Sequence, residues 1–371
     1  MRFLDRYRRF DALSGEEVSE RLRAEAGERR SRALQRVDPL DLRRTTWPEL
    51  PPPAVVNAIT FAARRSLHRY AEPRAADLRS ALAHRHAVRP EHLVVGAGAA
   101  QLLRDAFAEL VGPGDEVVVP WPSYSLYPLL ARRTGGHAVP VRGFSAAAVL
   151  SAVNERTRLV ALCNPNDPTG ELLRAGELRE LLETLPERVV VVLDEALRDF
   201  VDAEEPDAAL SLVARHPRML VVRTFSKAWG LAGLRCGYAV GGEGSEPLLE
   251  RLAPELGPNE LAVAGALEAL RSAAVNVAER VGAVAAERDR LAAALRELPV
   301  TALPSQANVV WLAAPGLDGV ELARRLERHA VLVAPGGPLG DSGHVRAALS
   351  RPAATDRLVE ALARALQPVR G

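Results

Sequence analysis

Short apolar runs recur along the first two thirds of this chain, and they limit its fold more than any other feature of the sequence. They occupy residues 92–98, 114–120, 158–167, 187–196 and 219–226. Their apolar residues are consecutive instead of alternating with polar ones, which is typical of strands buried on both faces. Because helix-like stretches separate the runs, we expect an α/β fold with a mostly parallel sheet sandwiched by helices.

The length of 371 residues is sufficient for two domains. We expect a large α/β domain over residues 59–257. The texture then changes to Ala-rich and Leu-rich helices, followed by mixed strand and helix signals, which predicts a smaller α+β domain over residues 258–371. Residues 1–58 are expected to form an N-terminal arm, with a charged helix at 16–36, and to contribute to the smaller domain.

Composition excludes several classes of protein. The net charge of +1 argues against a nucleic-acid-binding protein. No run of about 18 apolar residues occurs and the N-terminal segment is charged, so we expect neither a membrane partner nor a secreted protein. The two cysteines lie far apart and the eight histidines show no metal-ligand spacing. The sequence therefore predicts a cytoplasmic protein without a metal site.

Lys227 is the only lysine of the chain, although Lys and Arg together number 48. Codon bias in a GC-rich genome is a simple explanation for scarce lysine. A lysine amine can, however, form a Schiff base with an aldehyde, which a guanidinium cannot do. The neighbouring Thr224, Ser226 and Arg235 offer two hydroxyls and a guanidinium, a set that suits a phosphate group. The aldehyde that carries a phosphate and bonds to lysine is pyridoxal phosphate (PLP).

The segment RTFSKAWGLAGLRCGY, residues 223–238, resembles the lysine segment of fold-type I PLP-dependent aminotransferases of class I and II. The pattern is most similar to that of histidinol-phosphate aminotransferases, and further motifs follow in the family's order. The resemblance implies PLP as the cofactor, Lys227 as its covalent partner and a homodimer whose active site includes residues of both subunits.

The resemblance also implies which residues surround the cofactor. The segment VGAGAAQLL, residues 95–103, would offer the backbone N–H groups of Ala99 and Ala100 to the phosphate at a helix N-terminus. The segment also resembles a dinucleotide-binding fingerprint, but it lacks the third glycine of that motif. Tyr124 would stack on the cofactor ring, with a core position as the alternative. Asp194, at the end of a buried run, would pair with the protonated ring nitrogen, with a helix N-cap as the alternative.

Four more residues are implied at the edge of the site. Tyr70 would reach the cofactor phosphate of the partner subunit, unless it is a surface aromatic residue. Arg346 would bind the substrate carboxylate through a bidentate fork, with Asn308 in the same pocket. Trp47, in the segment TTWP where the family carries Asn-Glu-Asn-Pro, would reshape the substrate pocket or else pack at the domain hinge.

Two departures from the family pattern concern the cofactor's ring oxygen. In NPNDPTG, residues 164–170, Asp167 replaces the asparagine that normally donates a hydrogen bond to this oxygen. Leu197 stands where aminotransferases carry a tyrosine that donates to the same oxygen. An ionised carboxylate can only accept, so we expect Asp167 to repel the ring oxygen and to raise the pKa of the Schiff-base nitrogen.

We expect the chain to move an amino group between an amino acid, or an amino alcohol, and a 2-oxo acid, with Lys227 as general base. A PLP-dependent decarboxylase, cyclase or racemase of the same fold is the main alternative. Threonine-phosphate decarboxylases resemble this family and also lack the tyrosine at the position of Leu197. A cofactor-binding regulator or an inactive subunit is a further alternative, which would react with no amino acid.

Overall fold

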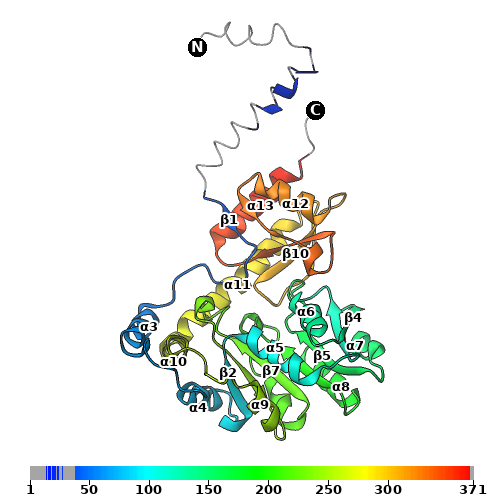
Figure 1. Ribbon diagram of the computed structural model, residues 1–371. Coiled ribbons are helices and arrows are strands. Elements are labelled where there is room, and N and C mark those ends of the chain that lie inside the picture. Colours follow the sequence, from blue (N-terminus) through cyan, green and yellow to red (C-terminus); the bar gives the residue numbers. More distant parts are fainter. Residues whose placement is uncertain are drawn as a thin grey trace.

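The computed structural model describes residues 38–367 continuously, together with Ser14 and scattered positions between residues 16 and 27. The charged helix expected at 16–36 therefore lies largely outside the described residues. Figure 1 shows a larger part, built on a twisted sheet, and a smaller part around β10 (Val309–Ala313). The long helix α11 (Ala274–Leu295) leads from one part to the other.

The larger part is built on a seven-stranded sheet. In sheet order its strands are β2 (Leu93–Gly96), β8 (Gly237–Gly241), β7 (Met219–Thr224), β6 (Val190–Asp194), β5 (Thr157–Cys163), β3 (Glu116–Trp121) and β4 (His137–Arg142). The strands from β7 to β4 run parallel, whereas β8 is antiparallel to both of its neighbours. The predicted mostly parallel sheet is confirmed.

Both faces of this sheet are buried. Along β6, Val191 and Leu193 belong to one apolar cluster, whereas Val192 between them belongs to the other. One face packs against α5 (Ala99–Leu110), α6 (Leu126–Arg133) and α9 (Glu246–Leu252), and the other against α4 (Ala76–Arg85), α7 (Ala146–Ala152) and α8 (Ala175–Thr184). Consecutive apolar residues in the strands are thus explained, since alternate side chains point into different cores.

Two further helices lie beside the larger part. Helix α3 (Pro53–Ser66) packs along α10 (Glu260–Ser272), which also contacts α4. The side chain of Asn259 caps α10 by accepting a hydrogen bond from the backbone N–H of Ala262 at 2.8 Å. Within the described part of the chain, no single helix is long and apolar enough to cross a bilayer, although α10 and α11 pass such a test together across their 78° bend. The domain boundaries near residues 58 and 257 stay a prediction.

The smaller part is an α+β unit formed by both ends of the described chain. Its antiparallel sheet has the order β12 (Ala334–Pro335), β13 (His344–Ala348), β10 and β9 (Thr301–Ala302). The N-terminal strand β1 (Leu40–Asp41) pairs in parallel with β11 (Val331–Leu332). Helices α12 (Gly319–Glu327) and α13 (Pro352–Ala365) cover this unit.

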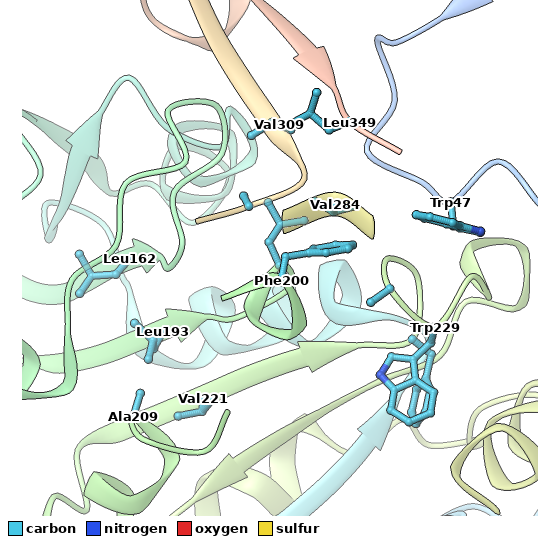
Figure 2. Packing of buried hydrophobic residues seen from close by; sticks show 14 of the residues in the cluster. Trp47, Leu162, Leu193, Phe200, Ala209, Val221, Trp229, Val284, Val309 and Leu349 are labelled. Atoms are coloured by element: carbon cyan, nitrogen blue, oxygen red, sulfur yellow. The ribbon is translucent and has the colours of Figure 1, made fainter. Parts of the chain in front are cut away.

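One apolar cluster connects the two parts. Figure 2 shows Leu193 and Val221 on the large sheet, Val309 in the smaller part, and Phe200 and Val284 between them. Phe200 is 1% exposed and Val284 is fully buried. This shared core fixes β13 and the N-terminal segment relative to the ends of the large sheet, where the candidate site lies.

Candidate active site

The candidate site lies where the parallel strands of the large sheet end. Cys163 is the last residue of β5, Asp194 the last of β6 and Thr224 the last of β7. Ligands of open α/β sheets bind beyond these carboxyl ends. The pocket there is lined by Thr46, Ala99, Ala100, Leu103, Tyr124, Cys163, Asp167, Asp194, Ala196, Leu197, Thr224, Ser226, Lys227, Ala232 and Arg235. It therefore contains Lys227 and all the predicted cofactor contacts except Tyr70.

One end of the pocket is a set of donors for an anion, which we call the anion cradle: Ala99, Ala100, Ser226 and Arg235. Helix α5 begins at Ala99 without a side-chain cap, so the dipole of its N-terminus faces the pocket. Arg235 Nη1 donates to Ser226 Oγ at 3.2 Å, and Ser226 Oγ lies 3.0 Å from Thr224 Oγ1. This combination of amides, a hydroxyl and a guanidinium suits a phosphate.

Gly98 allows Arg235 to lie close to the N-terminus of α5. Its φ is +82°, and a Cβ atom there would lie 2.5 Å from Arg235 Nη2. Arg235 itself has a φ of 57°, a left-handed conformation that turns its side chain back toward Ser226. The glycine thus lets the guanidinium pack directly against the helix N-terminus.

Asp194 also lines the pocket and is 3% exposed. Its Oδ2 accepts from the Tyr127 hydroxyl at 3.0 Å and its Oδ1 from the Ala196 backbone N–H at 3.0 Å. Burial raises the pKa of Asp194 to about 6, and these two hydrogen bonds oppose the rise. A buried carboxylate of this kind is stabilised by a cationic partner such as a protonated pyridine nitrogen.

Lys227 lies just after β7 and lines the same pocket. Burial lowers the pKa of its amine, while the charges of Asp167 and Asp194 oppose the decrease. Its Nζ donates a short hydrogen bond to Thr45 Oγ1, a residue of the N-terminal segment that is 5% exposed. The amine is therefore held in the pocket by a side chain 182 residues away in sequence.

Tyr124 and Leu197 shape the middle of the pocket. The Tyr124 ring meets the Tyr127 ring edge-on, at 5.6 Å between centroids and 87° between planes. Burial raises the pKa of the Tyr124 hydroxyl. Leu197 is 2% exposed and lines the same pocket, so an apolar side chain takes the position of the family's tyrosine.

Asp167 forms an ion pair with Arg346. Asp167 Oδ1 accepts from Arg346 Nη1 at 2.6 Å, and Arg346 Nη2 donates to the backbone oxygen of Arg43 at 2.7 Å. Both side chains are 12% exposed. The sequence predicts that Asp167 contacts the cofactor and that Arg346 contacts the substrate. In the structure the two side chains bind each other.

Arg346 and three other predicted residues are not among those that line the pocket. Tyr70 is 86% exposed, and its role toward a partner subunit stays a prediction. Asn308 is buried and donates to the backbone oxygen of Thr45 at 3.1 Å, so it supports the segment that contacts Lys227. Trp47 stacks between Arg280 and Arg351, at 5.3 and 5.9 Å from ring centroid to guanidinium carbon, and packs the N-terminal segment onto the core.

Sequence reasoning missed several residues that line the pocket or contact its residues. Thr46 lines the pocket and Thr45 contacts Lys227; both precede Trp47 in the segment that departs from the family pattern, and this departure was the only sign of them in the sequence. Tyr127 looks like a core residue in the sequence, and it is fully buried, yet its hydroxyl donates to Asp194. Among the described residues, no group of three or more His, Cys, Asp or Glu side chains could hold a metal ion.

The pocket fits PLP on three counts. The anion cradle suits the phosphate, buried Asp194 suits the pyridine nitrogen, and the amine of Lys227 suits the aldehyde.

Comparison with known proteins supports the same reading. A family model for aminotransferases of class I and II matches residues 38–366. An aromatic amino acid aminotransferase of Corynebacterium efficiens is 39% identical over 84% of this chain and 89% of its own length, and one of Thermobifida fusca is 41% identical over 77% and 80%. A histidinol-phosphate aminotransferase of Sinorhizobium meliloti, solved with pyridoxal-5'-phosphate, superposes with a TM-score of 0.80 and 28% identity, covering 91% of this chain and 93% of its own.

The family match extends over nearly the whole described chain, and the relatives and solved structures named above are aminotransferases. The predicted resemblance, cofactor and reaction type are thereby confirmed. The chain is a PLP-dependent transaminase, and it belongs to the class I and II aminotransferases.

Proposed function

We propose that this transaminase moves an amino group between an amino acid, or an amino alcohol, and a 2-oxo acid, with Lys227 as the catalytic residue. The observation that carries the proposal is that the chain's only lysine shares one pocket with buried Asp194 and the anion cradle. The names of the curated relatives support an aromatic side chain on the amino substrate.

PLP, when bound, supplies an aldehyde that takes up the amino group and a ring that draws electrons from the bond being broken. Lys227 is the residue that bonds to this aldehyde and, once released, moves a proton at its Nζ. The lowered pKa of its amine favours the unprotonated form that both tasks need. Thr45 Oγ1, which accepts a hydrogen bond from Nζ, would hold the released amine close to the reacting carbon.

The other residues of the pocket hold and orient the cofactor. The anion cradle would bind its phosphate, and Tyr124 would lie against its ring. Asp194 would keep a proton on the ring nitrogen, which makes the ring an effective electron acceptor. The Tyr127 hydroxyl and the Ala196 amide would fix the orientation of this carboxylate.

Two measurements on the PLP-loaded protein test the proposal. Borohydride reduction followed by peptide mapping should label Lys227, and a panel of amino acids and amino alcohols should convert the cofactor to its amine form. A labelled peptide without position 227 would contradict the assignment of the lysine. Release of carbon dioxide in place of a 2-oxo acid would point to the decarboxylase alternative.

We also infer a homodimer. Large apolar side chains are exposed on and next to α3, where Phe61 is 60%, Leu67 75% and Tyr70 86% exposed. Such a surface favours contact with a second copy, which would bring Tyr70 to the partner's cofactor. Light scattering should give about 80 kDa, twice the 39.9 kDa chain mass, and a mass near one chain would contradict the inference.

A cytoplasmic location is proposed as well. Cys163 and Cys236 are both free and buried, which supports a compartment where thiols stay reduced.

A further inference from the structure

The ion pair between Asp167 and Arg346 occupies the guanidinium that would otherwise await the substrate's carboxylate. Arg346 Nη1 donates to the Asp167 carboxylate at 2.6 Å and Nη2 to the backbone oxygen of Arg43 at 2.7 Å. The remaining nitrogen, Nε, is buried, and within the described chain it has no hydrogen-bond partner. Both outer nitrogens of the fork therefore already have acceptors, and one of these acceptors is charged.

The ion pair changes the charge that the site offers to a substrate carboxylate. The cations that line the pocket are Arg235, which serves the anion cradle, and Lys227, which serves the cofactor aldehyde. Arg346 contacts the lining residue Asp167, and the family resemblance assigns it to the substrate carboxylate. With asparagine at position 167, Arg346 would keep a full positive charge for an arriving carboxylate. Asp167 already balances that charge, and its own carboxylate repels a second one.

The backbones that carry both partners are held by hydrogen bonds to neighbouring elements. Arg346 lies in β13 between two strands, opposite Ala334 of β12 and Trp311 of β10. The turn that carries Asp167 is closed by a hydrogen bond from the backbone N–H of Gly170 to the oxygen of Asn166 at 2.7 Å.

The side chain of Asn166 pins this turn to the large part of the protein. Its Oδ1 accepts from Ser123 Oγ at 2.7 Å and its Nδ2 donates to Thr169 Oγ1 at 2.8 Å. On the other side, the backbone N–H of Gln306 donates to the oxygen of Gly170 at 2.7 Å. A substrate carboxylate that approaches Arg346 must therefore compete with Asp167.

We propose that Asp167 determines substrate specificity by taking the place of a substrate carboxylate at Arg346, so that the preferred amino donors lack a carboxylate on the carbon that bears the amine. Amino alcohols are the class that fits. This inference rests on the proposed transamination. The donor's C–N bond breaks, its carbon is oxidised to a ketone whose oxygen comes from water, and the cofactor aldehyde is reduced to the amine. The 2-oxo acid that later accepts the amino group meets the same competition, so its KM is raised by Asp167.

The test compares two donors with the same side chain, L-phenylalanine and L-phenylalaninol, on the PLP-loaded wild-type protein and the Asp167→Asn variant. Asparagine can still accept from Arg346 through its Oδ1 but carries no charge. Wild type should convert its cofactor with phenylalaninol at least as fast as with phenylalanine. The ratio of the rate with phenylalanine to the rate with phenylalaninol should be about tenfold or more higher in the variant than in wild type, and any effect of position 167 on the cofactor itself is common to both donors and cancels in this ratio.

A binding measurement gives a readout that does not depend on turnover. Calorimetric titration with 3-phenylpropionate should show about tenfold tighter binding to Asp167→Asn than to wild type, whereas 3-phenylpropan-1-ol should bind both alike. Asp202→Asn is the matched control, because it removes an ion pair with Arg288 outside the pocket, and it should alter none of these values.

Two results would overturn the inference: faster reaction of wild type with phenylalanine than with phenylalaninol, or equal affinity of wild type and Asp167→Asn for 3-phenylpropionate. If neither donor nor any other amino compound converts the cofactor, the proposed function itself fails. The carboxylate titration then still decides whether Asp167 competes for Arg346.

Discussion

Replacing Asp194 with asparagine should stabilise the cofactor-free protein at neutral pH while weakening its hold on PLP. The amide has the shape of the carboxylate but cannot ionise. Its oxygen can accept from the Ala196 N–H, which is 3.0 Å from Asp194 Oδ1. Its NH₂ group can donate to the Tyr127 hydroxyl, which is 3.0 Å from Oδ2 and can act as an acceptor. The variant therefore leaves no buried polar atom unpaired at this position.

The magnitude follows from the perturbed titration of the buried carboxyl. Burial raises the pKa of Asp194 from 3.8 to about 6. At about 1.4 kcal/mol per pH unit, ionisation of Asp194 therefore reduces the free energy of unfolding by about 3 kcal/mol. Because the folded protein holds the proton more tightly than the unfolded chain, the full free energy of unfolding is present below pH 3.8. It falls as the pH rises from 3.8 through about 6, and above that the reduction is constant.

Urea unfolding of the cofactor-free proteins at pH 8 and pH 5 measures the effect. Asp194→Asn should be more stable than wild type by about 3 kcal/mol at pH 8 and by about half of that at pH 5. Its affinity for PLP should fall by about tenfold or more, since the ring nitrogen loses its anionic partner. Exposed Asp289→Asn is the control and should change neither value. Equal stability of Asp194→Asn and wild type at pH 8 would refute the reasoning.

Two further substitutions test the ends of the pocket. Gly98→Ala should weaken PLP binding by about tenfold or more in a fluorescence titration, because the new methyl would lie 2.5 Å from Arg235 Nη2. Gly114→Ala is the control for backbone strain, because Gly114 has a similar φ of +85° but open space around it. Equal affinity of both variants for PLP would exclude the clash with Arg235. Tyr127→Phe removes the hydroxyl that donates to Asp194 and should lower stability at pH 8 by about 1.5–3 kcal/mol in urea unfolding, with a smaller loss below pH 6, where the carboxyl is protonated. A loss of the same size at both pH values would show that only packing was affected.

The apolar runs predict five strands of the large sheet because burial on both faces leaves no room for polar residues. The same sheet has two strands without that signal. β4 is an edge strand with several exposed residues and contains Pro140, so its sequence resembles a loop. β8 begins and ends with glycine, and at Gly237 a Cβ would lie 2.6 Å from the backbone nitrogen of Ala99.

Residues of the candidate site can be predicted from the sequence where one segment contains all of them. Lys227 and Arg235 lie in a single motif, and both line the pocket. Contacts between distant segments are not predictable in this way, since Asp167 and Arg346 are 179 residues apart. Motif comparison also draws attention to the bulkiest residue of the segment TTWP. Trp47 in fact packs between two arginines, while the threonine two positions earlier contacts the lysine.

The parallel pairing of Leu40 with Val331 has a consequence for biosynthesis. The strand that leads to Thr45 leaves the ribosome long before its partner strand and Arg346 do. Until those residues have emerged, Leu40 cannot pair with Val331 and Arg346 cannot bind the Arg43 backbone, although every residue of the anion cradle has already been made. The threonine that holds the lysine amine therefore takes its final place late, and firm capture of the cofactor waits for it.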